Sequence, residues 1–402
     1  MNELHVLISG ASIAGPATAL LLARQGHRVT IVERSPALRG GGQTVDLRGA
    51  GRTVIERMGL ASAASSRLLD QRGIAKVNAR GKRIASIPVE AFGGNGMVST
   101  HEILRGDLAD VLTEALTGEA GGSVEYLWDD TITTIDQRGE GVAVTFAGSP
   151  AQRFDLVVGA DGLNSAVRRA AFGPDSETRQ PIGLRYAWFT AAVDQPLDGW
   201  YLMHNARGGR VVSARPSRTK GEIKAAFALR GADDRRRGRE EQYRLFEDAF
   251  SDLGWLTPQL LRGMRSAQDW AYNDLAQIKL DRWTRGRVAL VGDAGYCPTP
   301  LTGLGTTLAL VGAYVLACEI MRSGGELAAA LHRYDEVMRP FVRKTQTLPP
   351  SGAAGYAPKS RIGVALGEAS YRYMNRWPLR SLFESQFVKS DGIDLPDYEP
   401  EA

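Results

Sequence analysis

Short apolar runs and a helical segment alternate at the beginning of the chain. Residues 4–9 form a short, mainly apolar run of the length that fills a buried parallel strand. A glycine-containing turn at 10–15 and then Pro16, which suits the first turn of a helix, precede the Ala- and Leu-rich segment 17–25. Residues 28–33 follow as a second candidate strand, with apolar residues at 29, 31 and 32. The pattern therefore predicts a strand, a helix and a second strand, which is the βαβ opening of a parallel sheet.

Later segments repeat this strand pattern and then change character. Two apolar runs, 155–159 and 287–291, each lead into a glycine and an aspartate, so we expect them to join the same parallel sheet. Residues 180–230 are instead rich in aromatic and alternating positions, broken by Gly, Pro and Asn, which predicts an antiparallel sheet. We expect residues 75–100 to add to that sheet, and a mostly helical tail to follow residue 349.

Composition and charge describe an ordinary folded protein. Of the 402 residues, 43% are hydrophobic and 23% are charged, which is enough for a sizeable core. The net charge is only +4, and acidic residues flank the densest basic cluster, at 235–239, which is typical of a solvated helix start. Nucleic acid is therefore not expected as a partner.

The sequence indicates neither a metal site nor a membrane segment. Cys297 and Cys318 have no CxxC or metal-ligand spacing, and the five histidines are scattered. The N-terminus lacks the features of a signal peptide, and no apolar stretch reaches the roughly 20 residues that span a bilayer. We expect a soluble, cytoplasmic protein without a metal or a membrane contact. No feature specifies the oligomeric state.

The turn after the first strand has the pattern of a dinucleotide-binding motif. Gly10 would permit the tight turn, Gly15 would let helix and strand pack closely, and Ser12 takes the middle glycine position. The helix N-terminus offers free N–H groups to a pyrophosphate, and Glu33 would accept hydrogen bonds from ribose hydroxyls. An unrelated α/β fold can also contain a glycine turn, but the strand–turn–helix–strand–acid order favours dinucleotide binding.

Two aspartates follow the later strands. Asp161 lies in Gly-Ala-Asp-Gly and Asp293 lies in Gly-Asp-Ala. Ligands of open α/β sheets bind beyond the carboxyl ends of the strands, where both acids are expected. Either acid could instead be structural, Asp161 in an Asx turn and Asp293 as a helix N-cap. The three motifs in this order indicate a nucleotide domain assembled from separated segments.

With these motifs, the sequence resembles the single-component, class A FAD-dependent monooxygenases typified by para-hydroxybenzoate hydroxylase, including their tetracycline-inactivating members. The resemblance implies an α/β fold: a Rossmann-like FAD-binding domain with an inserted antiparallel β-sheet substrate domain and a C-terminal helix. The implied division places FAD-binding segments at 1–74, 101–179 and 276–348, substrate-sheet segments at 75–100 and 180–275, and a helical tail at 349–402.

The resemblance also implies which residues bind FAD. Arg105 resembles the family's arginine that contacts the cofactor, with a surface helix arginine as the alternative. The loop 40–47 and residues 300–305 resemble the stretches that pass beside the flavin ring. The candidate cofactor-binding residues are Gly10, Ser12, Gly15, Glu33, Arg34, Arg105, Asp161, Asp293, Pro300, Gly303, Leu304 and Gly305.

Four positions depart from the family's pattern. Ser12 replaces the middle glycine, and Tyr296 stands where many relatives have histidine. Leu304 and Thr307 replace polar residues that are common beside the flavin. We still expect FAD to bind, and these changes concern how the flavin is positioned.

The resemblance implies that NADPH or NADH reduces the FAD and that O2 then gives a C4a-hydroperoxyflavin, whose distal oxygen passes to the substrate. Because the cofactor supplies this chemistry, the protein has to supply binding, orientation and exclusion of water. The sequence accordingly nominates no catalytic residue. It contains no second glycine-rich motif, which agrees with a reductant that binds only transiently.

Aromatic residues in the expected sheet suit an aromatic or polyketide-like substrate. Any one of them could instead belong to the core of the sheet. The candidate substrate contacts are Trp188, Tyr201, Met203, His204 and Phe227.

Three alternatives remain open at this point: a flavin-dependent halogenase, a flavin reductase or desaturase, and a flavin-binding protein without turnover. The halogenase segment Trp-x-Trp-x-Ile-Pro is missing, because Phe-Thr-Ala follows Trp188. Product formation coupled to NAD(P)H consumption would distinguish a monooxygenase from a binding protein, and a halide-dependent product would indicate a halogenase.

Overall fold

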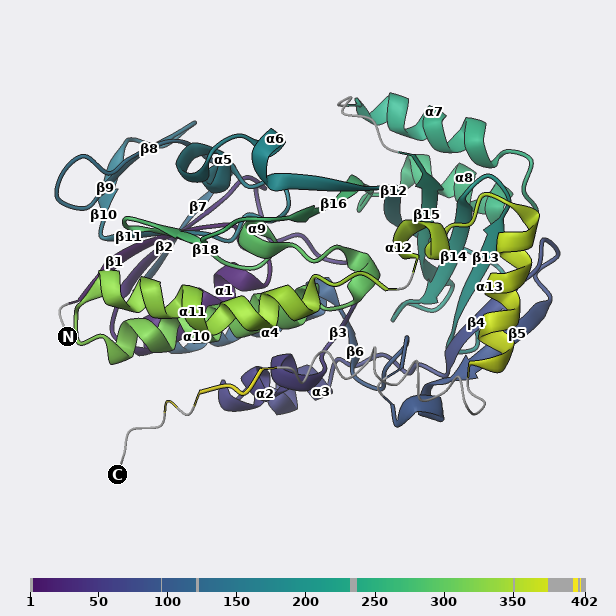
Figure 1. Ribbon diagram of the computed structural model, residues 1–402, viewed down its shortest axis with the longest axis horizontal. Coiled ribbons are helices and arrows are strands. Elements are labelled where there is room, and N and C mark those ends of the chain that lie inside the picture. The colour runs from purple at the N-terminus through teal and green to yellow at the C-terminus, as the bar shows by residue number, and fades with distance from the viewer. Residues whose placement is uncertain are drawn as a thin grey trace.

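The protein is built on two large sheets, with helices packed around both (Figure 1). The computed structural model describes residues 3–94, 96–120, 123–231, 237–349, 351–374, 393–396 and 398.

The first sheet has six strands in the order β17-β18-β11-β1-β2-β7. All neighbouring pairs are parallel except β17 and β18. The strands are β1 (His5–Ser9), β2 (Arg28–Glu33), β7 (Val124–Trp128), β11 (Leu156–Gly159), β17 (Thr284–Arg285) and β18 (Val288–Leu290). Distant segments therefore meet in one parallel sheet, which confirms the βαβ opening and the two later strands.

Helix α1 (Ala14–Arg24) connects β1 to β2 and begins three residues before the expected start at 17. The earlier start is possible because Pro16 lies in the first turn, where its missing N–H needs no partner. The other helices of this half are α4 (Arg105–Ala120), α5 (Ala166–Phe172), α6 (Asp175–Thr178), α9 (Asp293–Tyr296), α10 (Gly305–Arg322) and α11 (Leu327–Thr345).

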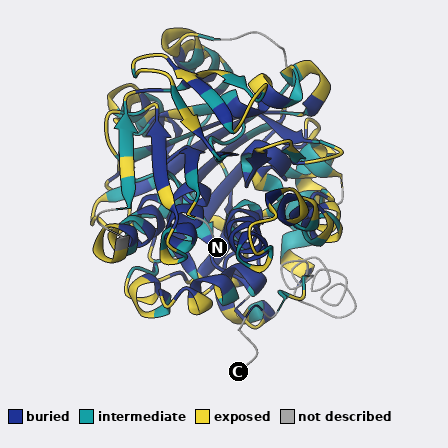
Figure 2. Cartoon of the chain, turned by 90° about the vertical axis from the view of Figure 1, so that its left-hand side faces the viewer, coloured by how far each residue is buried: buried dark blue, intermediate teal, exposed yellow. Residues whose placement is uncertain are grey.

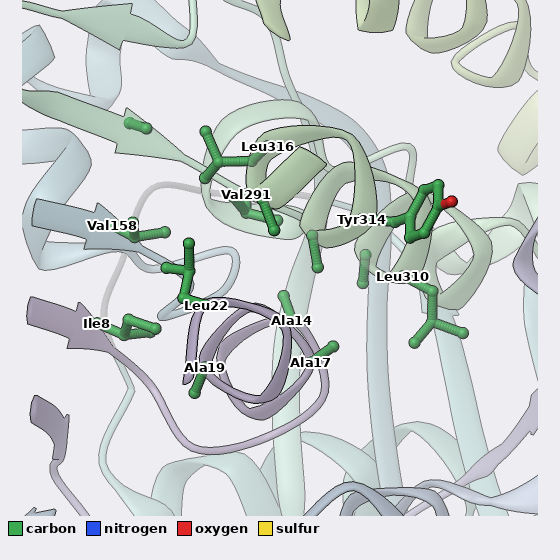
Figure 3. Close-up of a cluster of buried hydrophobic side chains, with 14 of the residues drawn as sticks. Ile8, Ala14, Ala17, Ala19, Leu22, Val158, Val291, Leu310, Tyr314 and Leu316 are labelled. Carbon is green, nitrogen blue, oxygen red and sulfur yellow. The ribbon is translucent and has the colours of Figure 1, made fainter. Parts of the chain in front are cut away.

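The apolar runs become strands that are covered on both faces. Ile8 and Val158 are fully buried, and α1 packs against α10 beside them (Figure 3). Ala14 and Ala17 lie on α1 in the same cluster, and their small side chains allow the two helices to approach closely. Continuous apolar sequence is what such doubly covered strands require.

Helix α10 is the one helix in the described part of the chain that is long and apolar enough to cross a membrane. However, 78% of its apolar window is buried inside the structure, as in a core helix. Figure 2 shows the same division, with buried elements inside and exposed residues on the outer helices and loops.

The second sheet has seven strands in the order β16-β12-β15-β14-β13-β4-β5, and it is antiparallel except between β13 and β4. Its strands are β4 (Gly73–Val77), β5 (Arg83–Pro88), β12 (Arg179–Ala192), β13 (Trp200–Ala206), β14 (Arg210–Pro216), β15 (Glu222–Arg230) and β16 (Ala271–Ile278). The antiparallel sheet expected from residues 180–230 is thus confirmed.

Different helices cover the two faces of the seven-stranded sheet. Helices α7 (Arg239–Phe250) and α8 (Thr257–Ser266) pack on one face. Helices α12 (Gly352–Tyr356) and α13 (Arg361–Tyr373) pack on the other, as part of the expected helical tail. Helix α7 starts at Arg239, the last residue of the basic cluster. Residues 235 and 236 of that cluster lie outside the described residues, as do residues 375–392 of the tail.

Small elements complete the fold. They are β3 (Thr44–Asp46), β6 (Glu102–Leu104), β8 (Ile132–Asp136), β9 (Val142–Phe146), β10 (Gln152–Phe154), α2 (Gly49–Arg57), α3 (Ala61–Ser65) and the 3-10 turns η1 (Val89–Phe92) and η2 (Pro300–Thr302).

Candidate active site

A cavity of about 1600 Å³ is lined by residues from both large sheets. Most of the candidate cofactor residues border it, although they come from distant parts of the sequence. They are Gly10, Ser12, Glu33, Arg34, Arg105, Asp161, Asp293, Pro300, Gly303 and Leu304. Gly15 and Gly305 do not line the cavity: Gly15 packs against the backbone of Gly10, and Gly305 is the first residue of α10.

The glycine turn has the geometry that the motif predicts. Gly10 has φ +107°, and a Cβ there would lie 2.6 Å from the carbonyl oxygen of Ala160. A Cβ on Gly15 would lie only 1.9 Å from the carbonyl oxygen of Gly10. Both positions therefore need glycine because the backbone passes too close for any side chain.

Ser12 takes the place of the middle glycine and contacts Arg105. The Arg105 guanidinium donates a hydrogen bond of 2.9 Å to Ser12 Oγ and a longer one of 3.3 Å to the carbonyl oxygen of Arg39. Burial, and secondly the charge of Arg39, lower the pKa of Arg105. Among the described residues, Arg105 has no ion pair with a carboxylate. A half-buried cation beside a helix N-terminus suits an anion such as a pyrophosphate.

Glu33 lies at the end of β2, where it also braces the turn. Its carboxylate accepts hydrogen bonds from the backbone N–H of Ala11 at 2.9 Å and of Ser35 at 3.0 Å. Arg39 lies 3.6 Å from the same carboxylate, and the next residue, Arg34, is exposed. A carboxylate fixed in this way can accept hydrogen bonds from a ribose at the rim of the cavity.

The two aspartates lie at the starts of two different helices, α5 and α9. Asp161 Oδ2 accepts hydrogen bonds from the N–H groups of Ala166 at 2.7 Å and Val167 at 3.3 Å, so this acid does brace the start of α5. Its Oδ1 is buried without a hydrogen-bond partner. Asp293 is the first residue of α9, not its N-cap, and burial raises the pKa of both acids.

Two glycines leave open space beside these acids. Gly162 has φ +78° and Gly303 has φ +71°, and no atom lies within 4 Å of a Cβ built on either one. Both border the cavity. Open glycine backbone, a carboxylate oxygen without a partner and a cation facing a helix start together fit a dinucleotide with several hydroxyl groups. The residues present therefore fit FAD.

The unusual Tyr296 points away from the cavity. It is fully buried, and its hydroxyl lies 2.9 Å from that of Tyr334, which donates to the carbonyl oxygen of Leu290 at 2.8 Å. A Cβ on Gly312 would lie 1.9 Å from the Tyr296 hydroxyl, so the glycine makes room for it. Thr307 is also fully buried. Of the four departures, only Ser12 and Leu304 border the cavity.

Aromatic side chains of the seven-stranded sheet form the opposite wall of the cavity. Tyr186 and Trp188 lie two residues apart on β12 and stack with ring centroids 4.5 Å apart. Tyr201 and Met203 reach the same wall from β13. Three of the five candidate substrate residues, Trp188, Tyr201 and Met203, are thus brought together beside the cofactor candidates.

His204 and Phe227 lie on the other face of the sheet, contrary to their proposed place in the cavity. Phe227 is fully buried, with its ring centroid 4.9 Å from that of Phe250 on α7. His204 Nδ1 lies 3.0 Å from the carbonyl oxygen of Val77, and burial lowers its pKa. Successive strand residues point to opposite faces, so the side chain of His204 lies opposite that of Met203, and the side chain of Phe227 lies opposite that of Ala226.

Sequence reasoning missed a polar group at the aromatic wall. Arg215 pairs with Glu102 at 2.8 Å, and its guanidinium lies 3.9 Å from the ring centre of Tyr201. The hydroxyls of Tyr186 and Tyr356, the latter on α12, lie 2.9 Å apart. Burial raises the pKa of both phenols, so they stay protonated at neutral pH and can donate hydrogen bonds. The alternation of inward and outward side chains along β14 is the one sequence signal that could have placed Arg215 at the cavity. No local pattern indicated that Tyr356 would lie there.

The fold and the site define a class of protein, the FAD-dependent monooxygenases. The chain matches the family model described as an FAD binding domain over residues 3–347, and it belongs to this family. This finding confirms the resemblance inferred from the motifs.

Individual relatives agree with this assignment. The chain is 32% identical over 403 residues to a flavin-dependent monooxygenase of Legionella longbeachae, covering 99% of both chains. It is 41% identical over 355 residues to an uncharacterized protein of Mycobacterium tuberculosis, covering 88% of this chain and 94% of that one. The protein is therefore a flavoenzyme that uses NAD(P)H and O2 on a small molecule.

Solved structures show the same architecture. The crystal structure of the tetracycline destructase Tet(51) matches with a TM-score of 0.81 and 31% identity, over 99% of this chain and 100% of that one. Klebsiella pneumoniae HpxO, solved with FAD and uric acid, matches in fold with a TM-score of 0.74 at 21% identity. FAD, when bound, supplies the redox chemistry, and the chain's own residues bind it, orient the substrate and exclude water.

Proposed function

We propose that this monooxygenase hydroxylates a planar aromatic or polyketide-like molecule that lies against the wall formed by Tyr186, Trp188 and Tyr201. The observation that carries the proposal is one continuous cavity, bordered on one side by the glycine turn and on the other by this aromatic wall. A flat ring system can stack on Trp188 while a polar substituent reaches the sheet. The likeness to a tetracycline destructase supports a polycyclic substrate of this kind.

The polar groups of the wall favour a substrate with a phenolic or enolic hydroxyl. Tyr186 and Tyr356 form a pair of protonated hydroxyls, each able to donate and to accept. Arg215 adds a cation whose charge is balanced by Glu102. Because this ion pair is neutral overall, the wall suits a neutral or weakly acidic hydroxyl better than a highly charged group.

On the cofactor side, the proposal assigns each candidate residue a part of FAD. Arg105, Ser12 and the turn at Gly10 would hold the pyrophosphate, and Glu33 would hold the adenosine ribose. Asp293 would bind the ribityl chain, with Asp161 close to the pyrophosphate. The candidates that would border the flavin ring are Pro300, Gly303 and Leu304. Arg34, at the rim, would contact the adenosine part.

The reductant would be NADPH or NADH, bound transiently at the cavity. A reducing, cytoplasmic location fits the two cysteines, since Cys297 and Cys318 are both free and buried.

The test is oxidation of NADPH and NADH by the FAD-loaded protein, with and without a panel of phenols and tetracyclines. Oxygen uptake, peroxide and product mass would be measured together. The proposal expects at least one planar substrate to stimulate oxidation and to gain one oxygen atom. Substrate-independent oxidation that yields only peroxide across aromatic and polyketide panels would contradict the proposed substrate class. A halide-dependent product would contradict the reaction type.

A further inference from the structure

The glycine loop, defined here as residues 40–43, crosses from the nucleotide side of the cavity to the aromatic wall. Gly41 and Gly42 have φ +69° and +87°, in the left-handed region that favours glycine. Gly42 and Gln43 border the cavity directly. Because three of its four residues have no side chain, the loop can be held in place mainly through its backbone.

The nucleotide side holds the loop through the start of α4. The backbone N–H of Gly106 donates a hydrogen bond of 2.8 Å to the carbonyl oxygen of Gly41. The backbone N–H of Arg105 donates one of 3.0 Å to the carbonyl oxygen of Gln43. A Cβ on Gly42 would lie 2.7 Å from Arg105 Nε. The loop is therefore in close contact with the cation assigned to the pyrophosphate.

The sheet side holds the loop through one carboxylate, Asp269. Asp269 accepts hydrogen bonds from Thr190 N at 2.7 Å and from Thr190 Oγ1 at 2.6 Å. The same carboxylate faces the glycine loop: its Oδ2 would lie 3.3 Å from a Cβ built on Gly41, and the backbone N–H of Gly42 is close enough to lower its pKa. Lys224 Nζ lies 3.6 Å from the carboxylate and donates to Thr190 Oγ1 at 2.6 Å. Burial raises the pKa of Asp269, but the hydrogen bonds from Thr190 and Gly42 and the charge of Lys224 outweigh it and lower the pKa overall.

The position of Thr190 connects this cluster to the substrate side. Thr190 follows Tyr186 and Trp188 at every second residue of β12, so all three share the cavity face of the strand. Lys224 is its direct partner on β15. Asp269 is therefore the link between the aromatic wall and the glycine loop.

We propose that Asp269 is a positioning residue, which fixes the glycine loop beside the flavin by holding the Gly42 N–H from the substrate sheet. This inference rests on the proposed binding of FAD in the cavity. Without Asp269, the dinucleotide end of the cofactor keeps its own contacts at Glu33 and Arg105, whereas the flavin end loses a fixed neighbour. The flavin is then less well shielded from water, and a smaller share of the NAD(P)H oxidised leads to hydroxylated product.

The experiment compares Asp269→Asn and Asp269→Ala with the wild type and with Arg218→Met. Arg218 forms an ion pair of 3.2 Å with Asp107 on α4, which also joins the sheet side to the nucleotide side but does not border the cavity. Hydrogen–deuterium exchange of the loop amides is measured on the FAD-free protein, and the fluorescence and visible spectrum of FAD on the loaded protein.

In Asp269→Ala, the Gly42 amide should exchange at least tenfold faster, and quenching of FAD fluorescence should fall while FAD affinity changes only a few-fold. Asp269→Asn, whose amide oxygen can still accept one hydrogen bond, should lie between Asp269→Ala and the wild type, and Arg218→Met should match the wild type. Unchanged exchange in Asp269→Ala would overturn the proposal, and so would an equal increase throughout the seven-stranded sheet. If the wild type binds no FAD, the proposed function fails, and the exchange data still decide whether Asp269 holds the loop.

Discussion

The two large sheets border the same cavity but contribute to it in different ways. The six-stranded parallel sheet is covered on both faces, and its contribution comes from the turns beyond the strand ends, at Gly10, Asp161 and Asp293. The seven-stranded sheet contributes mainly the side chains of one face, while most of the other face is packed under α7 and α8. Turns with special backbone geometry are visible in sequence as glycines and acids. The choice between two faces of a strand is not.

The largest effect should come from Gly15→Val, which tests the turn of the parallel sheet. The Cβ would overlap the carbonyl oxygen of Gly10, so α1 would have to move away from β1. Because the clash is with backbone and cannot be relieved by a side chain, we expect a loss of more than about 5 kcal/mol of stability, in the exceptional range for one substitution, together with loss of FAD binding. The measurements are urea unfolding and FAD titration.

Gly118→Ala is the matched control, because Gly118 lies exposed in α4 with no atom within 4 Å of a Cβ. This change should stabilise the helix by about 1 kcal/mol and leave FAD binding unchanged. Normal FAD affinity in Gly15→Val would contradict the close approach of helix and turn.

Phe227→Ala should have the next largest effect on stability. It tests the face of the seven-stranded sheet that packs under α7 and α8. Removal of a fully buried ring that contacts Phe246 and Phe250 should cost about 3–5 kcal/mol of stability. The KM for the substrate should stay within about twofold in protein that remains folded, because the ring does not border the cavity. A large rise in KM without a loss of stability would instead indicate that Phe227 contacts the substrate.

A smaller, pH-dependent effect is expected from Lys76, on the face of the sheet beneath α13. Its amine lies 2.5 Å from Asn205 Oδ1 and 4.4 Å from the ring centre of Tyr371, with Glu368 as the acid that raises its pKa. Burial nevertheless lowers the pKa of Lys76 to about 7, from an ordinary value of 10.5.

Between these two pKa values the unfolded chain binds a proton that the folded protein does not. The wild type should therefore lose stability as the pH falls from 10 to 7, by up to about 1.4 kcal/mol per pH unit, and lose no more from this group below pH 7. Lys76→Met should remove this dependence. The measurement is the free energy of unfolding of both proteins at several pH values between 7 and 9. If this free energy changes equally with pH in the two proteins, Lys76 is not buried as a neutral amine.

Trp188→Leu should have the smallest effect on stability and a selective effect on the substrate. Trp188 lies on the cavity face and stacks on Tyr186 without being fully buried. Loss of one stacking surface should raise KM about tenfold, which corresponds to about 1.4 kcal/mol, with FAD affinity unchanged. Steady-state kinetics with the substrate found by the panel would check this prediction. An unchanged KM would show that the substrate does not stack on Trp188.

Most of the parallel sheet could be predicted because each local signal agreed with the fold. The centres of segments 4–9 and 28–33 are apolar where the strands are covered on both faces, and Gly10 and Gly15 stand where the backbone leaves no room for a Cβ. Much less of the aromatic wall could be predicted. His204 and Phe227 have the same chemistry as true cavity residues, and one step along a strand decides which face they occupy.

The sequence by itself determined the class of protein: the order of the glycine turn, Asp161 and Asp293 specified a dinucleotide-binding fold and, through family resemblance, FAD. Only the tertiary structure decided which residues meet around the cavity. Arg215 pairs with Glu102 and Tyr356 pairs with Tyr186 across 113 and 170 positions of sequence, respectively. Such contacts depend on strand register and on how helices cover the sheet, and neither leaves a local pattern, because the energy of a long-range contact is set by both partners at once.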